Sequence, residues 1–197
     1  MQITATMVKE LRGKSGAGIM ECKQALKETK GDSDEAVTLL RKKGLAKADK
    51  KADRATGEGR IESYIHAGGK IGVLLQLNCE TDFVANTPDF QELAKDISMQ
   101  IAASKPRFVS RDFVTEEILE KEKEIYAHQA RESGKPENII EKIVSGKMNR
   151  FYEETCLLDQ EFVKNPDMSV QNLIKEKIAK LGENIVVENF SRFEIEK

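Results

Sequence analysis

Two apolar stretches joined by glycines restrict the fold of this chain more than any other feature. Residues 61–66 and 71–78 are rich in β-branched and aliphatic side chains, and Ala67-Gly68-Gly69 separates them. Glycine readily adopts the positive φ angles that a tight turn requires, so this pattern predicts a β-hairpin. A further β-branched and aromatic segment after Gly182 predicts a third strand, with irregular alternation around residues 189–191.

Most of the remaining sequence has helical periodicity. Residues 88–104 and 170–180 each predict one helix. Residues 115–133 and 136–154 predict two longer helices, and the short connection between them indicates a helical hairpin. Together these patterns predict an α+β fold, in which a small antiparallel sheet packs with helices and the helical hairpin protrudes.

The amino-terminal 45 residues predict a separate bundle of three short helices. Thr4 or Thr6 can cap the first helix and Asp32 or Ser33 the third, and the helices are expected to end near Gly13, Gly31 and Gly44. A bundle of this size is marginal alone, because it buries little apolar surface.

A basic, alanine-rich stretch follows this bundle. Residues 46–59 therefore predict a helical linker, and the domain boundary is expected there. The predicted organisation is a three-helix module over residues 1–45, the linker over 46–59, and an α+β core over 60–197 that includes the helical hairpin at 115–154.

Charge and composition exclude several classes of protein. The 197 residues contain 32 Lys and Arg against 34 Asp and Glu, a net charge of −2, whereas nucleic-acid binders usually carry a strongly basic face. No segment is apolar enough for a membrane span, and no signal sequence precedes the first helix. Three widely spaced cysteines and two histidines give no metal-binding pattern. We therefore expect a cytoplasmic protein without nucleic acid, membrane, metal or cofactor.

The sequence LNCETDFVAN, at residues 77–86, is unusual. A large aromatic, Phe83, follows Asp82 just beyond the second predicted strand, where water should reach it. From position alone, Phe83 would be a core residue at a strand end, with Asp82 capping a turn, because apolar side chains usually pack inside.

Two long, irregular motifs resemble one known family. LRGKSGAGIMECKQAL at residues 11–26 and LNCETDFVAN at residues 77–86 are similar to the signature regions of bacterial elongation factor Ts. The segments ASKPRFV, IIEKIVSGKMNRFYEE and ENIVVENFSRFE also match, so the resemblance extends over essentially the whole chain. The single core resembles the short forms of this family rather than the long forms, which carry the core twice.

The resemblance implies a guanine-nucleotide exchange factor that makes no covalent bonds and acts on elongation factor Tu. It also implies that the amino-terminal module is of the ubiquitin-associated type and that two chains form a homodimer. The residues implied to contact the nucleotide domain of the partner and to disturb its magnesium site are Thr81, Asp82, Phe83 and Val84. The amino-terminal module is implied to contribute Arg12, Ile19 and Met20.

Two alternatives remain open at this point. The spacing of Ile19 with Cys22 and Leu26 also suits a core position, which would leave Met20 as the more exposed residue of the pair. The chain could also be a protein-interaction adaptor without effect on nucleotide release, or a ribosome-associated accessory protein that binds RNA through residues 41–54.

Overall fold

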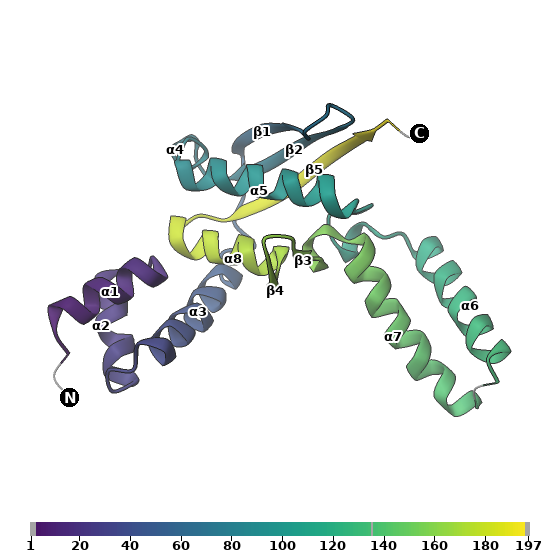
Figure 1. Cartoon of the computed structure of the whole chain (residues 1–197), viewed down its shortest axis with the longest axis horizontal. Helices are drawn as coiled ribbons and strands as arrows, with labels where there is room; N and C mark the ends of the chain where they lie inside the picture. Colours follow the sequence, from purple (N-terminus) through teal and green to yellow (C-terminus); the bar gives the residue numbers. More distant parts are fainter. Residues whose placement is uncertain (1–2, 135, 196–197) are drawn as a thin grey trace. The chain divides into compact units, whose positions relative to one another are not determined.

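The computed structural model describes residues 3–134 and 136–195, and these residues form an α+β fold (Figure 1). The helices are α1 (Ala5–Ser15), α2 (Ile19–Glu28), α3 (Ser33–Asp49), α4 (Asp82–Ala85), α5 (Pro88–Ser104), α6 (Glu116–Glu132), α7 (Glu137–Thr155) and α8 (Val170–Leu181). The strands are β1 (Glu58–Ile65), β2 (Ile71–Cys79), β3 (Glu161–Phe162), β4 (Asn165–Ser169) and β5 (Ile185–Glu194). Two short 3-10 helices are η1 (Arg111–Phe113) and η2 (Leu157–Asp159).

The chain divides into two compact units. The first unit comprises Met1–Arg60, Leu77–Leu93 and Asn172–Val186, and the second comprises Ile61–Gln76, Ala94–Gln171 and Val187–Lys197. Helix α5 and the three long strands therefore begin in one unit and end in the other. The division into residues 1–45, 46–59 and 60–197 remains a prediction. Residues 1–2, 135 and 196–197, which it includes, lie outside the described part of the chain.

Helices α1, α2 and α3 pack around one apolar core and are called the amino-terminal module below. Thr4 caps α1 by accepting a hydrogen bond from the Met7 amide at 3.3 Å, and Asp32 caps α3 by accepting from two amides. The buried residues of this core are Val8, Leu11, Cys22, Ala25, Leu26, Ala36 and Leu40.

The prediction that the third helix ends at Gly44 is wrong. Helix α3 continues to Asp49, and Gly44 lies inside it. A Cβ atom at Gly44 would lie 3.2 Å from the Ala179 side chain in α8, so the glycine permits close helix packing rather than ending the helix. Ion pairs beside this contact join Arg41 to Glu176 and Lys175 to Asp49.

Strands β1, β2 and β5 form an antiparallel sheet in that order. The predicted glycine turn connects β1 to β2, with positive φ angles at Gly68 and Gly69. The Ile195 amide donates to the Lys70 carbonyl at 2.9 Å, so the end of β5 lies beside the start of β2. Burial along β5 changes phase at residues 188–189, where both side chains are exposed, close to the predicted irregularity.

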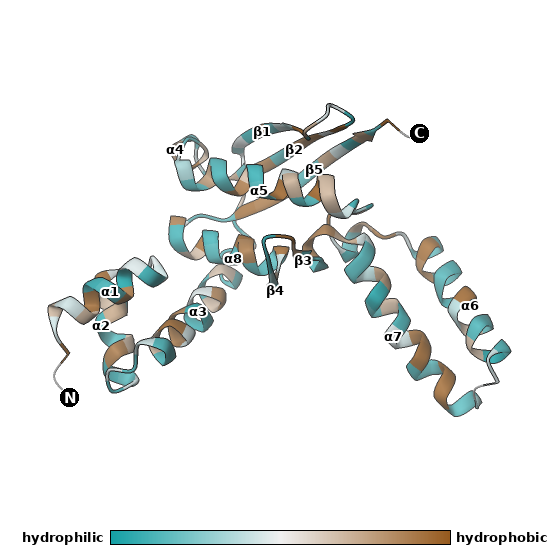
Figure 2. Ribbon diagram, in the orientation of Figure 1, coloured by the Kyte–Doolittle hydropathy of each residue, from teal (hydrophilic) through white to brown (hydrophobic). Residues whose placement is uncertain are grey.

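In the second unit, the two faces of the sheet differ in their cover. On one face Val73 and Leu75 are buried, and Arg192 of β5 donates to the Ala102 carbonyl of α5 at 3.1 Å. The other face carries large apolar side chains that remain exposed. These residues are Ile61, Ile65, Leu74, Phe193 and Ile195. Figure 2 colours the hydrophobic stretches of these strands brown.

Helices α6 and α7 form the predicted hairpin (Figure 1). The short ribbon of β3 and β4 was not predicted, because strands this short carry little periodicity. The buried side chain of Gln100 in α5 secures it, since its amide group donates to the Glu161 carbonyl at 3.1 Å and accepts from the Val163 amide at 2.8 Å.

Candidate partner-binding surface

The TDFV sequence forms the start of a one-turn helix rather than a loop. Thr81 is the N-cap of α4, and its hydroxyl oxygen accepts from the Val84 amide at 3.4 Å. Phe83 is 82% exposed, so its ring is not a core residue of its own unit. Asp82 is also exposed, Val84 is half-buried, and Ala85 is the buried side chain of this turn. Thr81, not Asp82, caps the turn.

A carboxylate from a distant part of the chain binds the start of α4. Glu183, in the loop between α8 and β5, accepts from the Thr81 amide at 3.0 Å and from the Thr81 hydroxyl at 2.7 Å. The Cys79 thiol donates to the Thr81 carbonyl at 3.1 Å, and burial raises the pKa of this thiol. The amide, the hydroxyl and the carbonyl of Thr81 are thus all engaged.

A second hydrogen bond joins the same two segments, and here the loop after α8 is the donor and the segment before α4 is the acceptor. The Asn184 amide donates to the Glu80 carboxylate at 2.7 Å, and this bond, together with Arg54, lowers the pKa of Glu80. The Asn184 side chain is buried and donates to the carbonyls of Ala52 and Arg54 at 3.0 and 2.9 Å. The loop that carries Glu183 is therefore itself held to the segment after α3.

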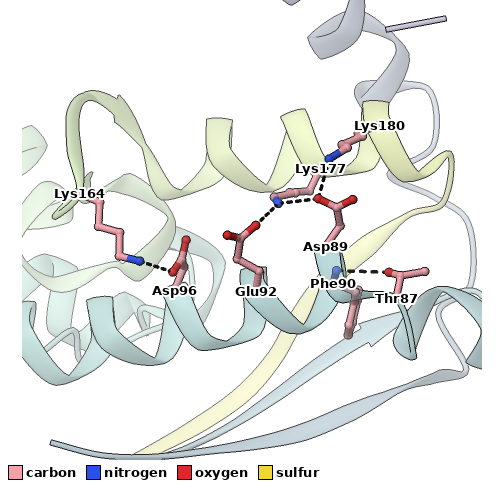
Figure 3. Close-up of polar contacts among 8 residues, drawn as sticks. All are labelled: Thr87, Asp89, Phe90, Glu92, Asp96, Lys164, Lys177 and Lys180. Atoms are coloured by element: carbon pink, nitrogen blue, oxygen red, sulfur yellow. Dashed lines mark hydrogen bonds and ion pairs between the residues drawn. The ribbon is translucent and has the colours of Figure 1, made fainter. Parts of the chain in front are cut away.

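The other end of α4 leads into α5 through a polar turn. The Asn86 side chain donates to the Asp82 carbonyl at 2.9 Å, and the Thr87 hydroxyl accepts from the Phe90 amide at 3.3 Å (Figure 3). Phe90 is fully buried and fixes the first turn of α5.

Charged side chains join the first turn of α5 to α8 (Figure 3). The Asp89 carboxylate accepts from Lys180 at 2.6 Å and from Lys177 at 3.2 Å, and these bonds lower the pKa of Asp89. Burial opposes the charge of Lys177, but the carboxylates of Glu92 and Asp89 outweigh it and raise the pKa of Lys177. Both ends of α4 are therefore connected, directly or through α5, to α8 and the loop after it.

The three residues implied for the amino-terminal module are all exposed. Met20 is 75% exposed and Ile19 is 55% exposed, so Ile19 is not in the core, although its spacing with Cys22 and Leu26 permitted that. Arg12 and Ile19 border a groove of about 520 Å³ with apolar and basic walls. Its lining residues are Ile3, Thr4, Ala5, Val8, Lys9, Arg12, Ile19 and Lys23.

Sequence reasoning did not identify Glu80, Glu183 or Asn184 as part of this surface. Their relevance depends on contacts between residues 102 to 104 positions apart, which no local spacing reveals. Within residues 3–134 and 136–195, no group of three or more His, Cys, Asp or Glu side chains is placed to hold a metal ion. No helix in the same ranges has the length and apolar character required to cross a membrane.

Comparison with known proteins gives one consistent family. The model of the family described as Elongation factor TS matches residues 4–197. An Elongation factor Ts from Geobacter sulfurreducens is 60% identical over 98% of this chain and 89% of its own length. Relatives with the same name from Carboxydothermus hydrogenoformans and Thermosipho melanesiensis are each 56% identical over 98% of this chain, covering 89% and 98% of their own lengths. The chain therefore belongs to the elongation factor Ts family.

Proposed function

We propose that this chain accelerates GDP release from elongation factor Tu by inserting Phe83 of α4 into the nucleotide domain of that partner. Membership of the elongation factor Ts family gives the general role, nucleotide exchange during translation elongation. The way in which Thr81, Asp82, Phe83 and Val84 perform that role is the proposal.

The exposure of Phe83 carries this proposal. A phenylalanine ring that is 82% exposed gains little from its own fold, whereas burying it fully in a partner contributes roughly 1.5–3 kcal/mol. Aromatic side chains of this kind are frequent hot spots of protein interfaces. Phe83 is therefore suited to act as an anchor whose burial takes place in the complex.

Insertion of the ring accounts for nucleotide release through the bound magnesium ion. In a GTPase, backbone amides and a Mg²⁺ ion hold the phosphates. Mg²⁺ requires nearly ideal octahedral geometry, so a small displacement of its ligands weakens its binding. The factor by which the chain weakens GDP binding must equal the factor by which GDP weakens the binding of the chain. No bond-making step on this chain is needed.

The amino-terminal module supplies a second contact in this proposal. Arg12, Ile19 and Met20 would bind the nucleotide domain beside the α4 contact, and the ubiquitin-associated type of bundle is part of the same proposal. The exposed pair Ile19 and Met20 and the basic groove beside Arg12 support it. Charged and apolar groups side by side favour a partner surface of mixed, partly acidic character.

We also propose a homodimer that forms through the uncovered face of the sheet. Five large apolar side chains are exposed there, among them Ile61, Leu74 and Phe193, and contiguous apolar patches mark interaction surfaces. Leu74→Lys should shift sedimentation toward the monomer, and an unchanged sedimentation coefficient would argue against this interface. The proposed place of action is the cytoplasm.

The decisive experiment measures release of a fluorescent GDP from elongation factor Tu by stopped flow. Phe83→Ala should lower the maximal release rate by tenfold or more, since hot-spot truncations cost about 2 kcal/mol or more. Phe113→Ala is the matched control, because Phe113 is also exposed, at 57%, but lies in η1 of the second unit. Equal release rates for wild type and a folded Phe83→Ala protein would refute the insertion mechanism.

The GDP-release assay also tests the adaptor alternative, because an adaptor would bind elongation factor Tu without changing GDP release. The RNA-binding alternative needs a separate measurement. An RNA-binding accessory protein would bind RNA with a steep salt dependence. Against that reading, several cations of residues 41–54 are already paired within the chain, namely Arg41, Lys43, Lys47 and Arg54.

A further inference from the structure

Helix α4 cannot fix its own direction. It has four residues, and one turn of helix is unstable in isolation because nucleation costs more than a single hydrogen bond returns. Its outward residue, Phe83, makes little contact with its own chain. The direction in which the ring projects must therefore be set by the groups that hold the ends of the turn.

We propose that Glu183 is a positioning residue for nucleotide exchange, whose carboxylate clamps Thr81 and thereby fixes the orientation of Phe83. This inference rests on the proposed function of Phe83. The clamp itself is a property of the free protein and can be observed without the partner.

The geometry of the clamp supports this assignment. One carboxylate oxygen of Glu183 accepts a hydrogen bond from the Thr81 amide, and the other accepts from the Thr81 hydroxyl. Two bonds to one residue restrict both its position and its rotation, and bonds to a charged acceptor are stronger than neutral ones. The Thr81 hydroxyl also accepts from the Val84 amide, so the clamp acts directly on the first turn of α4.

Glu183 is held by its neighbours on both sides. Gly182 has a φ of 85° and donates to the Ile178 carbonyl at 2.9 Å, which ends α8 at a defined place. Asn184 is buried and is bonded to Ala52, Arg54 and Glu80. The carboxylate therefore projects from a loop that is fixed at both ends.

If α4 is already fixed in the free protein, less conformational entropy is lost when the complex forms. Groups that are already held in the bound geometry lose less freedom on association. Loss of the clamp should therefore impair insertion of Phe83 more than it impairs the stability of the fold. Ala85 and Phe90 remain buried and keep α4 attached to the unit.

A double-mutant cycle tests the inference with elongation factor Tu and a fluorescent GDP. Glu183→Ala should lower the maximal release rate about tenfold, the size expected for loss of a hydrogen bond to a charged group. In the Phe83→Ala background the same change should have no further effect, because Glu183 acts through Phe83. Equal fold-losses in both backgrounds would overturn the inference, since they would indicate an independent or merely structural role.

Two further variants provide rescue and control. Glu183→Gln keeps one side-chain acceptor and should restore part of the rate, whereas Glu188→Ala removes an exposed carboxylate from the neighbouring strand and should leave the rate unchanged. If Glu183→Ala does not fold, Glu183→Gln takes its place in the double-mutant cycle. A Glu183→Gln rate no higher than that of folded Glu183→Ala would count against the clamp.

Hydrogen exchange of the free protein tests the clamp itself. The release rates then separate failure of this inference from failure of the proposed function. Glu183→Ala should accelerate exchange of the Thr81 and Val84 amides, while the amides of α8 keep their protection. Wild-type release rates with Glu183→Ala, beside a defective Phe83→Ala, would overturn this inference alone. Wild-type release rates with Phe83→Ala would overturn the proposed function and this inference together.

Discussion

The two surfaces proposed for partner binding are held by different kinds of interaction. Ile19 and Met20 stand in the first turn of α2, and Cys22 and Leu26 of the same helix pack in an apolar core. Phe83 stands on the single turn of α4, where Ala85 is the one buried side chain and polar contacts hold the ends. An exposed apolar residue can therefore be supported either by a hydrophobic core or by directional hydrogen bonds.

This difference predicts different responses to mutation. Hydrophobic burial contributes much of the stability of a bundle but has little directional preference. Hydrogen bonds contribute less net stability but fix geometry. Changes beneath α2 should therefore mainly affect the free energy of unfolding, whereas changes around α4 should mainly affect the rate of nucleotide release.

The largest effect on stability is expected in the module core. Leu26 is 1% exposed, and Leu26→Ala should lower the free energy of unfolding by about 2–5 kcal/mol because it leaves a cavity. Urea denaturation measures this loss, with Ile139→Ala, a truncation of an exposed aliphatic side chain, as the matched control. If Leu26→Ala unfolds as wild type does, the module core is not the support of Ile19 and Met20.

A smaller effect is expected for Met20 itself. Met20→Ala should raise the concentration of factor needed for half-maximal GDP release several-fold, up to about tenfold. The maximal release rate should stay near wild type, because this contact contributes binding without reaching the magnesium site. Titration in the stopped-flow assay gives both quantities. A lower maximal rate with an unchanged half-maximal concentration would remove the distinction between the two surfaces.

The two threonine caps allow a closer comparison. Thr4→Ala removes the cap of α1 and should lower the free energy of unfolding by about 1 kcal/mol, without changing the maximal release rate. Thr81→Ala removes a cap of the same type together with the hydroxyl bond to Glu183, so it should lower the release rate. Measuring both variants by denaturation and stopped flow tests this; a release defect in Thr4→Ala would contradict it.

The smallest effect is a pH dependence of stability. The Asn184 amide and Arg54 lower the pKa of Glu80 below the ordinary pKa of a glutamate side chain. The stabilisation from these contacts is therefore complete above that value and is lost as pH falls through the lower pKa of the folded state. Unfolding measurements between about pH 3 and 6 should show less acid destabilisation in Glu80→Gln than in wild type. If the free energy of unfolding falls equally with pH in Glu80→Gln and in wild type, Glu80 makes no such contribution.

Local sequence signals located most of the elements. The glycine turn at Gly68 and Gly69 and the bounds of α5 are as predicted, because backbone geometry and helical periodicity leave a direct trace in sequence. The prediction failed at the end of α3 and at β3 and β4, where distant partners decide the outcome. Gly44 looks like a helix stop in sequence, but its contact with Ala179 makes it an interior packing position.

The sequence by itself determined the family, the α+β class and the identity of Phe83 as an unusual aromatic beyond a strand. The tertiary structure decided that the ring is exposed, that Ile19 is exposed as well, and that Glu183 holds Thr81 from 102 positions away. The physical reason is that periodicity and turn chemistry act over a few residues. Burial and hydrogen-bond partners, by contrast, depend on which distant segments the fold brings together.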